Sequence, residues 1–365
     1  MMKIVLLIVG VVLILLLLGL TCLLFAKKKH KNRVAITTSD GVDFGEYVTI
    51  GGIQQFLYHR GENINNPVIL FLHGGPGSPM LPFVQDFQLP WEKHLTVVHW
   101  EQRNSGKTFY KNDPTKVAPT TTIEQLVADT HEVVLYLKQK YVKDKIWIVG
   151  HSWGSLLGSL FVHRHPQLVL GYIGVGQLVD MLENEQIGFD KALECATAAK
   201  CDKDIQTLLS LKPYPVRKFD SEMKNKLSKL RKVQGKYKLA ASPTAKLVYS
   251  AVTSPFYSIK DMRYMILADI DGINHGQQLI FQELFESFDL RSVTTNYQVP
   301  MFYIHGTSDW QTPYSIAEEY YTTVVAPQKG FYPIIDAGHA SMLDKPIDFS
   351  NALLSIIRRV DAEVL

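Results

Sequence analysis

An uninterrupted apolar stretch lies near the start of the chain. From Ile4 to Ala26, 23 consecutive residues carry no charge, and most of them are Leu, Val or Ile. As a helix, such a stretch would be about 34 Å long, enough to cross the hydrocarbon core of a bilayer. A cleaved secretory signal has a shorter apolar core and a small-x-small cleavage site, which Leu24-Phe25-Ala26 does not provide. The pattern therefore predicts a retained transmembrane helix over residues 4–26.

The rest of the chain alternates between strand-like and helix-like patterns. Residues 46–50 and 53–60 alternate in polarity around Gly51-Gly52, which predicts a β-hairpin. Continuous apolar runs typical of buried strands follow at 68–72, 95–100, 146–149, 169–175, 301–304 and 331–335. Helical periods lie at 121–141, 155–165, 315–324 and 346–360. Strands that alternate with helices imply right-handed crossovers and a mostly parallel sheet, an α/β fold.

The pattern of apolar and charged positions changes between residues 177 and 295. This stretch consists of charged, helical segments with few strand-like runs, so we expect a helical cap inserted between two strands of the sheet. The expected organisation is a transmembrane anchor (4–26), a basic juncture and tether (27–43), an α/β core (44–176 and 296–365) and the cap (177–295). The helix at 121–141 is expected to begin at a capping box formed by Thr121 and Glu124.

Charge adds an orientation to this picture. The net charge is +3, and the basic excess is concentrated directly after the apolar stretch, in Lys27, Lys28, Lys29, Lys31 and Arg33. The positive-inside rule then keeps this flank, and the domain that follows it, in the cytoplasm. Without this run the chain is slightly acidic, so no basic face indicates nucleic-acid binding. Three cysteines are too few for a disulfide framework.

A nucleophile motif follows the strand at 146–149. Residues 150–154 read Gly-His-Ser-Trp-Gly, a G-x-S-x-G pattern that stands directly between an apolar strand and a helix. A sharp strand-to-helix turn of this kind exposes the serine hydroxyl above the sheet. We therefore predict that Ser152 is a nucleophile. The side chain of His151 is expected to point away from it.

A serine nucleophile needs a base and an acid. Of twelve histidines, His339 alone follows the last strand and precedes the last helix, which favours it as the base. Asp309 comes just after the strand at 301–304 and is predicted to orient the imidazole. Asp180 is the alternative acid, whereas Asp336 is too near His339 along the chain. The predicted order Ser, Asp, His agrees with the strand arrangement.

Oxyanion donors and substrate-binding groups complete the predicted site. The glycine-rich turn at 73–77 follows the strand at 68–72, and the backbone N–H groups of Gly75 and Trp153 are the predicted oxyanion donors. No metal or organic cofactor is implied. Acidic residues of the cap are candidates for a cationic substrate end, although each is individually typical of a solvated helix: Glu183, Glu185, Glu194, Glu283 and Glu286.

Three stretches resemble the proline iminopeptidase-related branch of the α/β-hydrolases, and the likeness extends over about residues 44–360. Residues 73–79 (HGGPGSP) are similar to that branch's oxyanion loop, and residues 152–155 (SWGS) to its nucleophile elbow. Residues 100–108 (WEQRNSGKT) are similar to its Asp-Gln-Arg-Gly-x-Gly-x-Ser segment. Three departures stand out, since Glu101, Asn104 and His151 replace an Asp and two Gly residues.

The resemblance implies an α/β-hydrolase fold and an aminopeptidase that cleaves an N-terminal residue, in a family where cap glutamates bind the free amine. It does not identify those glutamates in this sequence, so the substrate-binding residues stay unassigned, with Glu183, Glu185, Glu283 and Glu286 of the cap as candidates. Two alternatives stay open: a carboxylesterase or lipase acting on small or lipidic esters, and a catalytically silent membrane scaffold. The expected partners are a small peptide or ester and the membrane, through residues 4–26.

Overall fold

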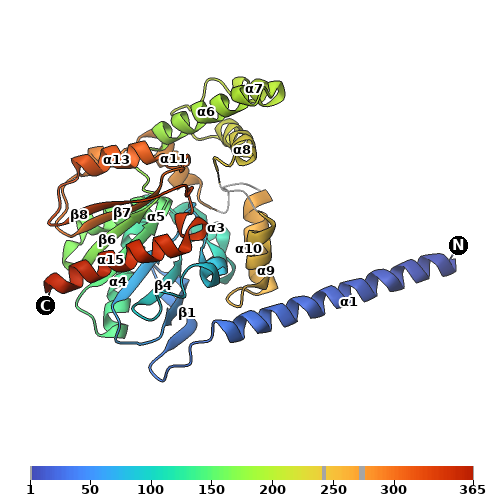
Figure 1. The fold of residues 1–365 in the computed structure, drawn as a ribbon, viewed down its shortest axis with the longest axis horizontal. Helices are drawn as coiled ribbons and strands as arrows, with labels where there is room; N and C mark the ends of the chain where they lie inside the picture. Colours follow the sequence, from blue (N-terminus) through green and yellow to red (C-terminus); the bar gives the residue numbers. More distant parts are fainter. Residues whose placement is uncertain (1, 241–243, 271–275, 365) are drawn as a thin grey trace.

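The protein, described here by a computed structural model over residues 2–240, 244–270 and 276–364, is built on one eight-stranded sheet with the order β1-β2-β4-β3-β5-β6-β7-β8 (Figure 1). The first two strands and β4 pair antiparallel, and the neighbours from β4 to β8 pair parallel. The strands are β1 (Val42–Ile50), β2 (Ile53–Gly61), β3 (Val68–Leu72), β4 (Thr96–Glu101), β5 (Ile146–His151), β6 (Val169–Val175), β7 (Met301–Gly306) and β8 (Lys329–Ile334). The predicted α/β class and hairpin are confirmed.

Helices cover both faces of the sheet and give it two hydrophobic cores. Every residue of β3 is buried, and its side chains alternate: Leu70 and Leu72 face one core, Ile69 and Phe71 the other. The continuous apolar runs in the sequence reflect this burial on both faces. One core is shared with helices α4 (Ile123–Tyr141), α5 (Trp153–Arg164) and α13 (Tyr314–Thr323), the other with η1 (Leu81–Asp86) and α15 (Pro346–Val364).

Short helices fill the remaining connections of the core. They are α2 (Gly106–Lys111), α3 (Pro114–Val117), η2 (Ala118–Thr120), η3 (Pro166–Leu168) and α14 (Ser341–Asp344). The helix α4 begins one residue later than expected, with Thr122 as the N-cap, whose hydroxyl accepts the Gln125 N–H at 3.1 Å. Thr121 is unavailable because it is buried and its hydroxyl bonds to Asn104 and Val117. The predicted capping pair Thr121–Glu124 is therefore wrong by one position.

Along the chain, a group of helices comes between β6 and β7, and most of them lie above and to the right of the sheet in Figure 1. It has its own hydrophobic cluster, in which Phe189, Leu230 and Phe285 are buried. We call residues 177–295 the cap, of which 241–243 and 271–275 lie outside the described residues. Its helices are α6 (Met181–Ala198), α7 (Asp202–Leu209), α8 (Ser221–Lys236), α9 (Ala245–Thr253), α10 (Ile259–Ile270), α11 (Gln278–Glu286) and α12 (Leu290–Val293).

The apolar stretch is part of one long helix, α1 (Met2–Arg33), which projects from the body and touches it only near its C-terminal end (Figure 1). By length and composition α1 is able to span a membrane. A signal sequence near the N-terminus would have the same length and composition. The basic juncture continues this helix to Arg33, and residues 34–41 connect it to β1, which begins at Val42. The side chain of Lys27 connects the helix to the body, because it donates hydrogen bonds to the carbonyls of Ser254 and Tyr257.

Candidate active site

The turn between β5 and α5 holds Ser152 in a strained backbone conformation, with φ 54° and ψ −122°. The two flanking glycines make this turn possible. A Cβ at Gly150 would stand 2.2 Å from the carbonyl oxygen of Gly154, and one at Gly154 would stand 2.1 Å from that of Leu72. The G-x-S-x-G pattern thus has a steric cause, since any larger residue would force the turn apart.

Three distant side chains meet at this turn. The Nε2 atom of His339 lies 2.8 Å from the Ser152 hydroxyl, and its Nδ1 lies 2.8 Å from Oδ2 of Asp309. Asp309 follows β7 and His339 follows β8, so the ends of neighbouring parallel strands bring them to the same edge of the sheet as Ser152. The structure therefore brings together the three residues that the sequence analysis selected.

Asp309 is held as a carboxylate. Burial by itself would raise its pKa, but the charge and hydrogen bond of His339 outweigh burial and hold the pKa of the Asp309 carboxyl well below its usual range. The backbone N–H groups of Gln311 and Thr312 donate to Oδ1 at 2.9 and 3.0 Å, and the Thr312 hydroxyl donates to Oδ2 at 2.8 Å. An ionised acid in this position fixes the imidazole with Nε2 free to accept the serine proton.

The glycine-rich loop after β3 packs directly on the serine turn. A Cβ at Gly74 would lie 3.0 Å from the Ser152 Cβ, and the loop is closed by a hydrogen bond from Ser78 N–H to the Gly74 carbonyl at 3.0 Å. Gly75 has φ 113°, a conformation that favours glycine. Trp153 is the first residue of α5, so its N–H has no carbonyl partner one turn earlier in the helix. Both predicted oxyanion donors thus belong to segments that border Ser152.

Gln102 ties the glycine loop to the serine turn. Its amide donates to the His73 carbonyl at 3.1 Å and accepts from the Trp153 indole N–H at 3.0 Å. The same segment accommodates two of the departures from the family pattern. Asn104 takes the place of a glycine with φ 59°, which asparagine tolerates. Glu101 is fully buried beside Tyr257, and burial raises the pKa of its carboxyl to about 7.

The side chain of His151 contacts His339, a contact that the sequence analysis did not predict. Its Nε2 donates to the His339 carbonyl at 3.0 Å, and the two imidazole rings are 5.0 Å apart. Burial, with the nearby His339, lowers the pKa of His151 to about 3, so the ring is neutral. Position 151 gave no signal of this in the sequence, because the contact is with a residue 188 positions away. Thr312 was missed too, although a hydroxyl three residues after the acid is a local pattern.

The other two carboxylates that the sequence analysis considered lie in different surroundings. Asp180 is the N-cap of α6, where its side chain accepts the Glu183 N–H at 2.8 Å. Asp336 is exposed in the turn after β8. Neither carboxylate has the contact with His339 that Asp309 makes.

The cap glutamates do not form one cluster. Glu185 is buried and paired with Arg231 and the Tyr214 hydroxyl. Glu183 pairs with Arg291 at 2.8 Å. Glu283 and Glu286 lie on the exposed side of α11, and Glu194 pairs with Lys191 on the surface of α6. Within the described ranges, no group of three or more His, Cys, Asp and Glu side chains is arranged to hold a metal ion.

Comparisons with known proteins agree with the architecture. Residues 67–246 match the model of the alpha/beta hydrolase fold family. The chain is 27% identical over 306 residues to the probable aminopeptidase YbaC of Bacillus subtilis, covering 84% of this chain and 93% of that protein. It is 28% identical over 127 residues to a proline iminopeptidase of Neisseria gonorrhoeae, covering 35% of this chain and 38% of that protein.

A solved structure is similar over most of the chain. The crystal structure of a proline iminopeptidase-related protein from Thermus thermophilus superposes with a TM-score of 0.56 at 21% identity, and covers 85% of this chain and 95% of that protein. At this identity the likeness supports the fold. Together with the sequence relatives and the matched family model, it shows that the chain has the α/β-hydrolase fold and is similar to the branch that contains the proline iminopeptidase-related proteins.

Proposed function

We propose that this hydrolase acts through Ser152, which attacks a carbonyl carbon of its substrate. The observation that carries the proposal is the continuous chain of hydrogen bonds from the Ser152 hydroxyl through His339 to Asp309, at 2.8 Å each. His339 takes the proton as the serine attacks and gives it to the leaving group, which leaves an acyl-enzyme. Water then repeats the sequence and releases the acyl product.

The oxyanion of each tetrahedral intermediate needs donors that are already in position. We assign this role to the backbone N–H groups of Gly75 and Trp153, which border the serine turn. One such donor contributes about 3–4 kcal/mol to lowering the barrier in measured enzymes. No metal or cofactor enters this mechanism.

The proposed substrate is a peptide, cleaved after an N-terminal, proline-like residue, as the names of the relatives suggest. Support comes from the names of the relatives, above all the probable aminopeptidase that aligns over 84% of this chain. We expect carboxylates of the cap to bind the free amine of the substrate. The candidates are Glu183, Glu185, Glu283 and Glu286. Glu185 is buried but its charge is balanced by Arg231, so an amine would have to share it.

A fluorophosphonate probe tests the nucleophile. Probes of this class react with an activated serine, so the full chain in detergent is expected to be labelled and Ser152→Ala to be blank. Ser155→Ala offers a control, since Ser155 stands in the same turn with its hydroxyl bonded to the Ser152 carbonyl. A wild-type chain that takes no label, although folded, would leave the silent scaffold as the better interpretation.

A carboxylesterase or lipase is the second candidate, and the contact between α1 and cap helix α9 favours it, because it brings the cap close to the helix proposed to be in the membrane. The two candidate functions can be distinguished by comparing the rate of hydrolysis of a prolyl arylamide with that of a short acyl arylester. A strong preference for the free amine supports the aminopeptidase. Turnover of the ester alone, with no gain from an added amine, rejects it.

We further propose that α1 is a single-pass membrane anchor with the catalytic domain on the cytoplasmic side. The apolar residues from Ile4 to Leu18 are mostly exposed, which in water would be costly. The basic residues between Lys27 and Arg33 form the flank that the positive-inside rule retains in the cytoplasm.

A further inference from the structure

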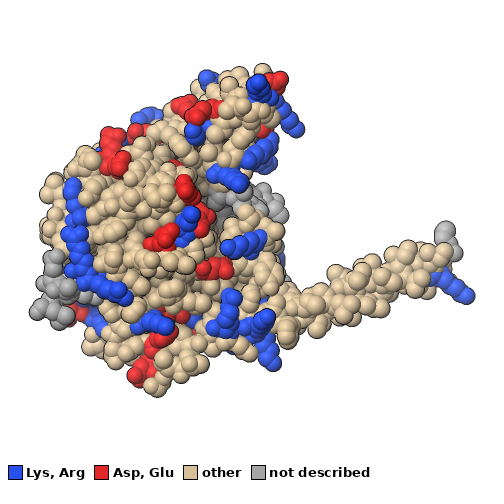
Figure 2. Space-filling model, viewed as in Figure 1, with Lys and Arg blue, Asp and Glu red and all other residues tan. Residues whose placement is uncertain are grey.

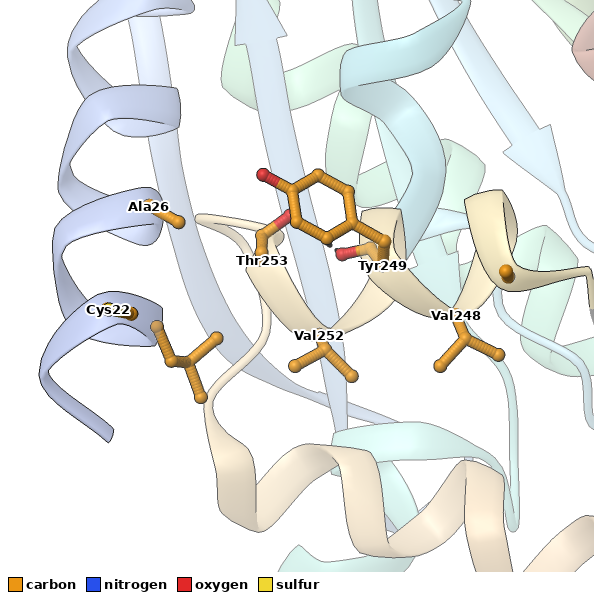
Figure 3. A pocket seen from close by; sticks show the side chains of 8 residues that line it. Cys22, Ala26, Val248, Tyr249, Val252 and Thr253 are labelled. Carbon is orange, nitrogen blue, oxygen red and sulfur yellow. Dashed lines mark hydrogen bonds between the residues drawn. The ribbon is translucent and has the colours of Figure 1, made fainter. Parts of the chain in front are cut away.

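An apolar groove separates the last apolar turns of α1 from cap helix α9 (Figure 3). It has a volume of about 700 Å³. One wall is formed by α1 and the other by α9, and the side chains that line it are apolar or weakly polar. They are Cys22, Leu23, Ala26, Ala245, Val248, Tyr249, Val252 and Thr253.

The level of this groove along α1 places α9 at the membrane boundary. The α1 wall, from Cys22 to Ala26, is the last part of the uncharged stretch. These positions cover about 6 Å of helix directly before the basic residues. That length is comparable to the depth to which interfacial helices are buried at the boundary between headgroups and acyl chains. On α9, Val248 and Tyr249 are 50% and 57% exposed, so the helix presents apolar side chains at this level.

Basic side chains stand directly beyond the groove, at the end that faces away from the bilayer. Lys27, Lys28 and Lys31 line a second hollow, together with Pro255, Tyr257 and Ser258. Lys27 is engaged with the carbonyls of Ser254 and Tyr257, whereas Lys28 and Lys31 are exposed. Figure 2 shows basic side chains gathered where α1 meets the body. An apolar slot with a cationic rim matches the two halves of an anionic phospholipid.

We propose that the groove between α1 and α9 binds one anionic phospholipid of the surrounding leaflet. An acyl chain fills the slot beside Leu23 and Val248, and the phosphate-bearing headgroup is bound by Lys28 and Lys31. The lipid thereby holds the cap against the bilayer. The inference rests on the proposed membrane anchoring of α1 and is independent of which bond the site hydrolyses.

A photoreactive lipid tests this directly on the full chain in nanodiscs. The discs contain phosphatidylcholine with a fifth of either phosphatidylglycerol or phosphatidylcholine bearing a diazirine on one acyl chain. After irradiation, labelled peptides are mapped by mass spectrometry. We expect labelling of α9 around Val248 and Tyr249 as well as of α1, and several-fold more with the anionic lipid.

The charge contribution is tested with two variants that remove the same number of charges from the same run. A basic residue that lies at the headgroup of a bound anionic lipid is expected to contribute about fivefold to its binding. Lys28→Gln with Lys31→Gln should therefore lower labelling of α9 by the anionic lipid about tenfold or more. Lys29→Gln with Arg33→Gln should leave it within about twofold, since neither residue lines the hollow.

Three results would overturn the proposal. They are labelling of α1 without labelling of α9, equal labelling of α9 by the two lipids, and an equal loss of α9 labelling in the two double variants. The last would mean that the basic run acts only as a diffuse charge. Alkaline extraction and fluorophosphonate labelling in the same preparation separate the causes. A chain that is extracted from membranes loses the anchor proposal, and a chain that is anchored and labelled at Ser152 but takes no lipid on α9 loses this proposal alone.

Discussion

The identity of the acid that orients His339 can be decided at the scale of single residues. Asp309→Asn keeps the shape of the side chain but lets the imidazole adopt the wrong tautomer, so kcat is expected to fall about 10³–10⁴-fold. Asp180→Asn serves as the control, because Asp180 caps α6 and should leave kcat within about threefold. Rates on an activated arylester report both. If Asp180→Asn is the crippled variant, the acid has been assigned to the wrong strand.

The buried Glu101 makes a prediction about stability and pH. Its carboxyl has a pKa of about 7 in the folded chain, raised by burial from 4.5. Between these two values the folded state keeps a proton that the unfolded state releases, so stability falls as pH rises from about 4.5 to 7. The full effect of this group is at most about 3 kcal/mol.

Glu101→Gln removes the titrating group while keeping an oxygen for the Tyr257 hydroxyl. Denaturant unfolding between pH 4 and 8 should therefore show a shallower decline in the variant than in the parent. Glu319→Gln, at an exposed position on α13, is the matched control and should reproduce the parent's curve. Parallel curves for parent and Glu101→Gln would show that the carboxyl is ionised throughout.

At the scale of elements, α10 supports the glycine loop through one hydroxyl. The Tyr264 hydroxyl lies 2.9 Å from the Gly77 carbonyl and 3.1 Å from that of Asn104, so it joins the cap to both loops beside the serine turn. Tyr264→Phe removes the donor and should loosen the proposed oxyanion loop. We expect kcat to fall about tenfold with a smaller change in KM, the equivalent of one hydrogen bond.

Tyr110→Phe is the matched control for this variant. Tyr110 packs edge-on against the ring of Tyr264, and its hydroxyl has no hydrogen-bond partner among the described residues. The variant should keep the parent's kcat. Equal losses in the two variants, or a loss of thermal stability with unchanged kcat in Tyr264→Phe, would contradict a role in positioning the loop.

The elements themselves could largely be predicted from the sequence, because strands buried on both faces leave continuous apolar runs such as 68–72. What the sequence did not reveal depends on contacts between distant residues. Thr122 caps α4 because Thr121 is occupied by Asn104. His151 turns toward His339 because that backbone carbonyl lies within reach across the sheet edge. The pairing of Glu185 with Arg231 likewise joins two cap helices, and no local sequence pattern predicts it.

At the scale of the whole molecule, the proposed anchoring through α1 makes a prediction about the side of the membrane on which the α/β core and the cap lie. The contact between α1 and α9 joins the proposed anchor to the cap. The basic flank predicts that this domain lies on the cytoplasmic side. The two cysteines of the cap, Cys195 and Cys201, are partly exposed and free, and they report the side directly.

A membrane-impermeant maleimide applied to intact cells should therefore leave Cys195 and Cys201 unlabelled, and permeabilised cells should show labelling of both. The double variant Cys195→Ser with Cys201→Ser should lose the signal, because the remaining Cys22 lies within the proposed span, where the bilayer shields it. Labelling of intact cells at the cap cysteines would instead put the domain outside. The positive charges after the span would then act on lipid headgroups without setting the topology, and the substrates would be those of the exterior.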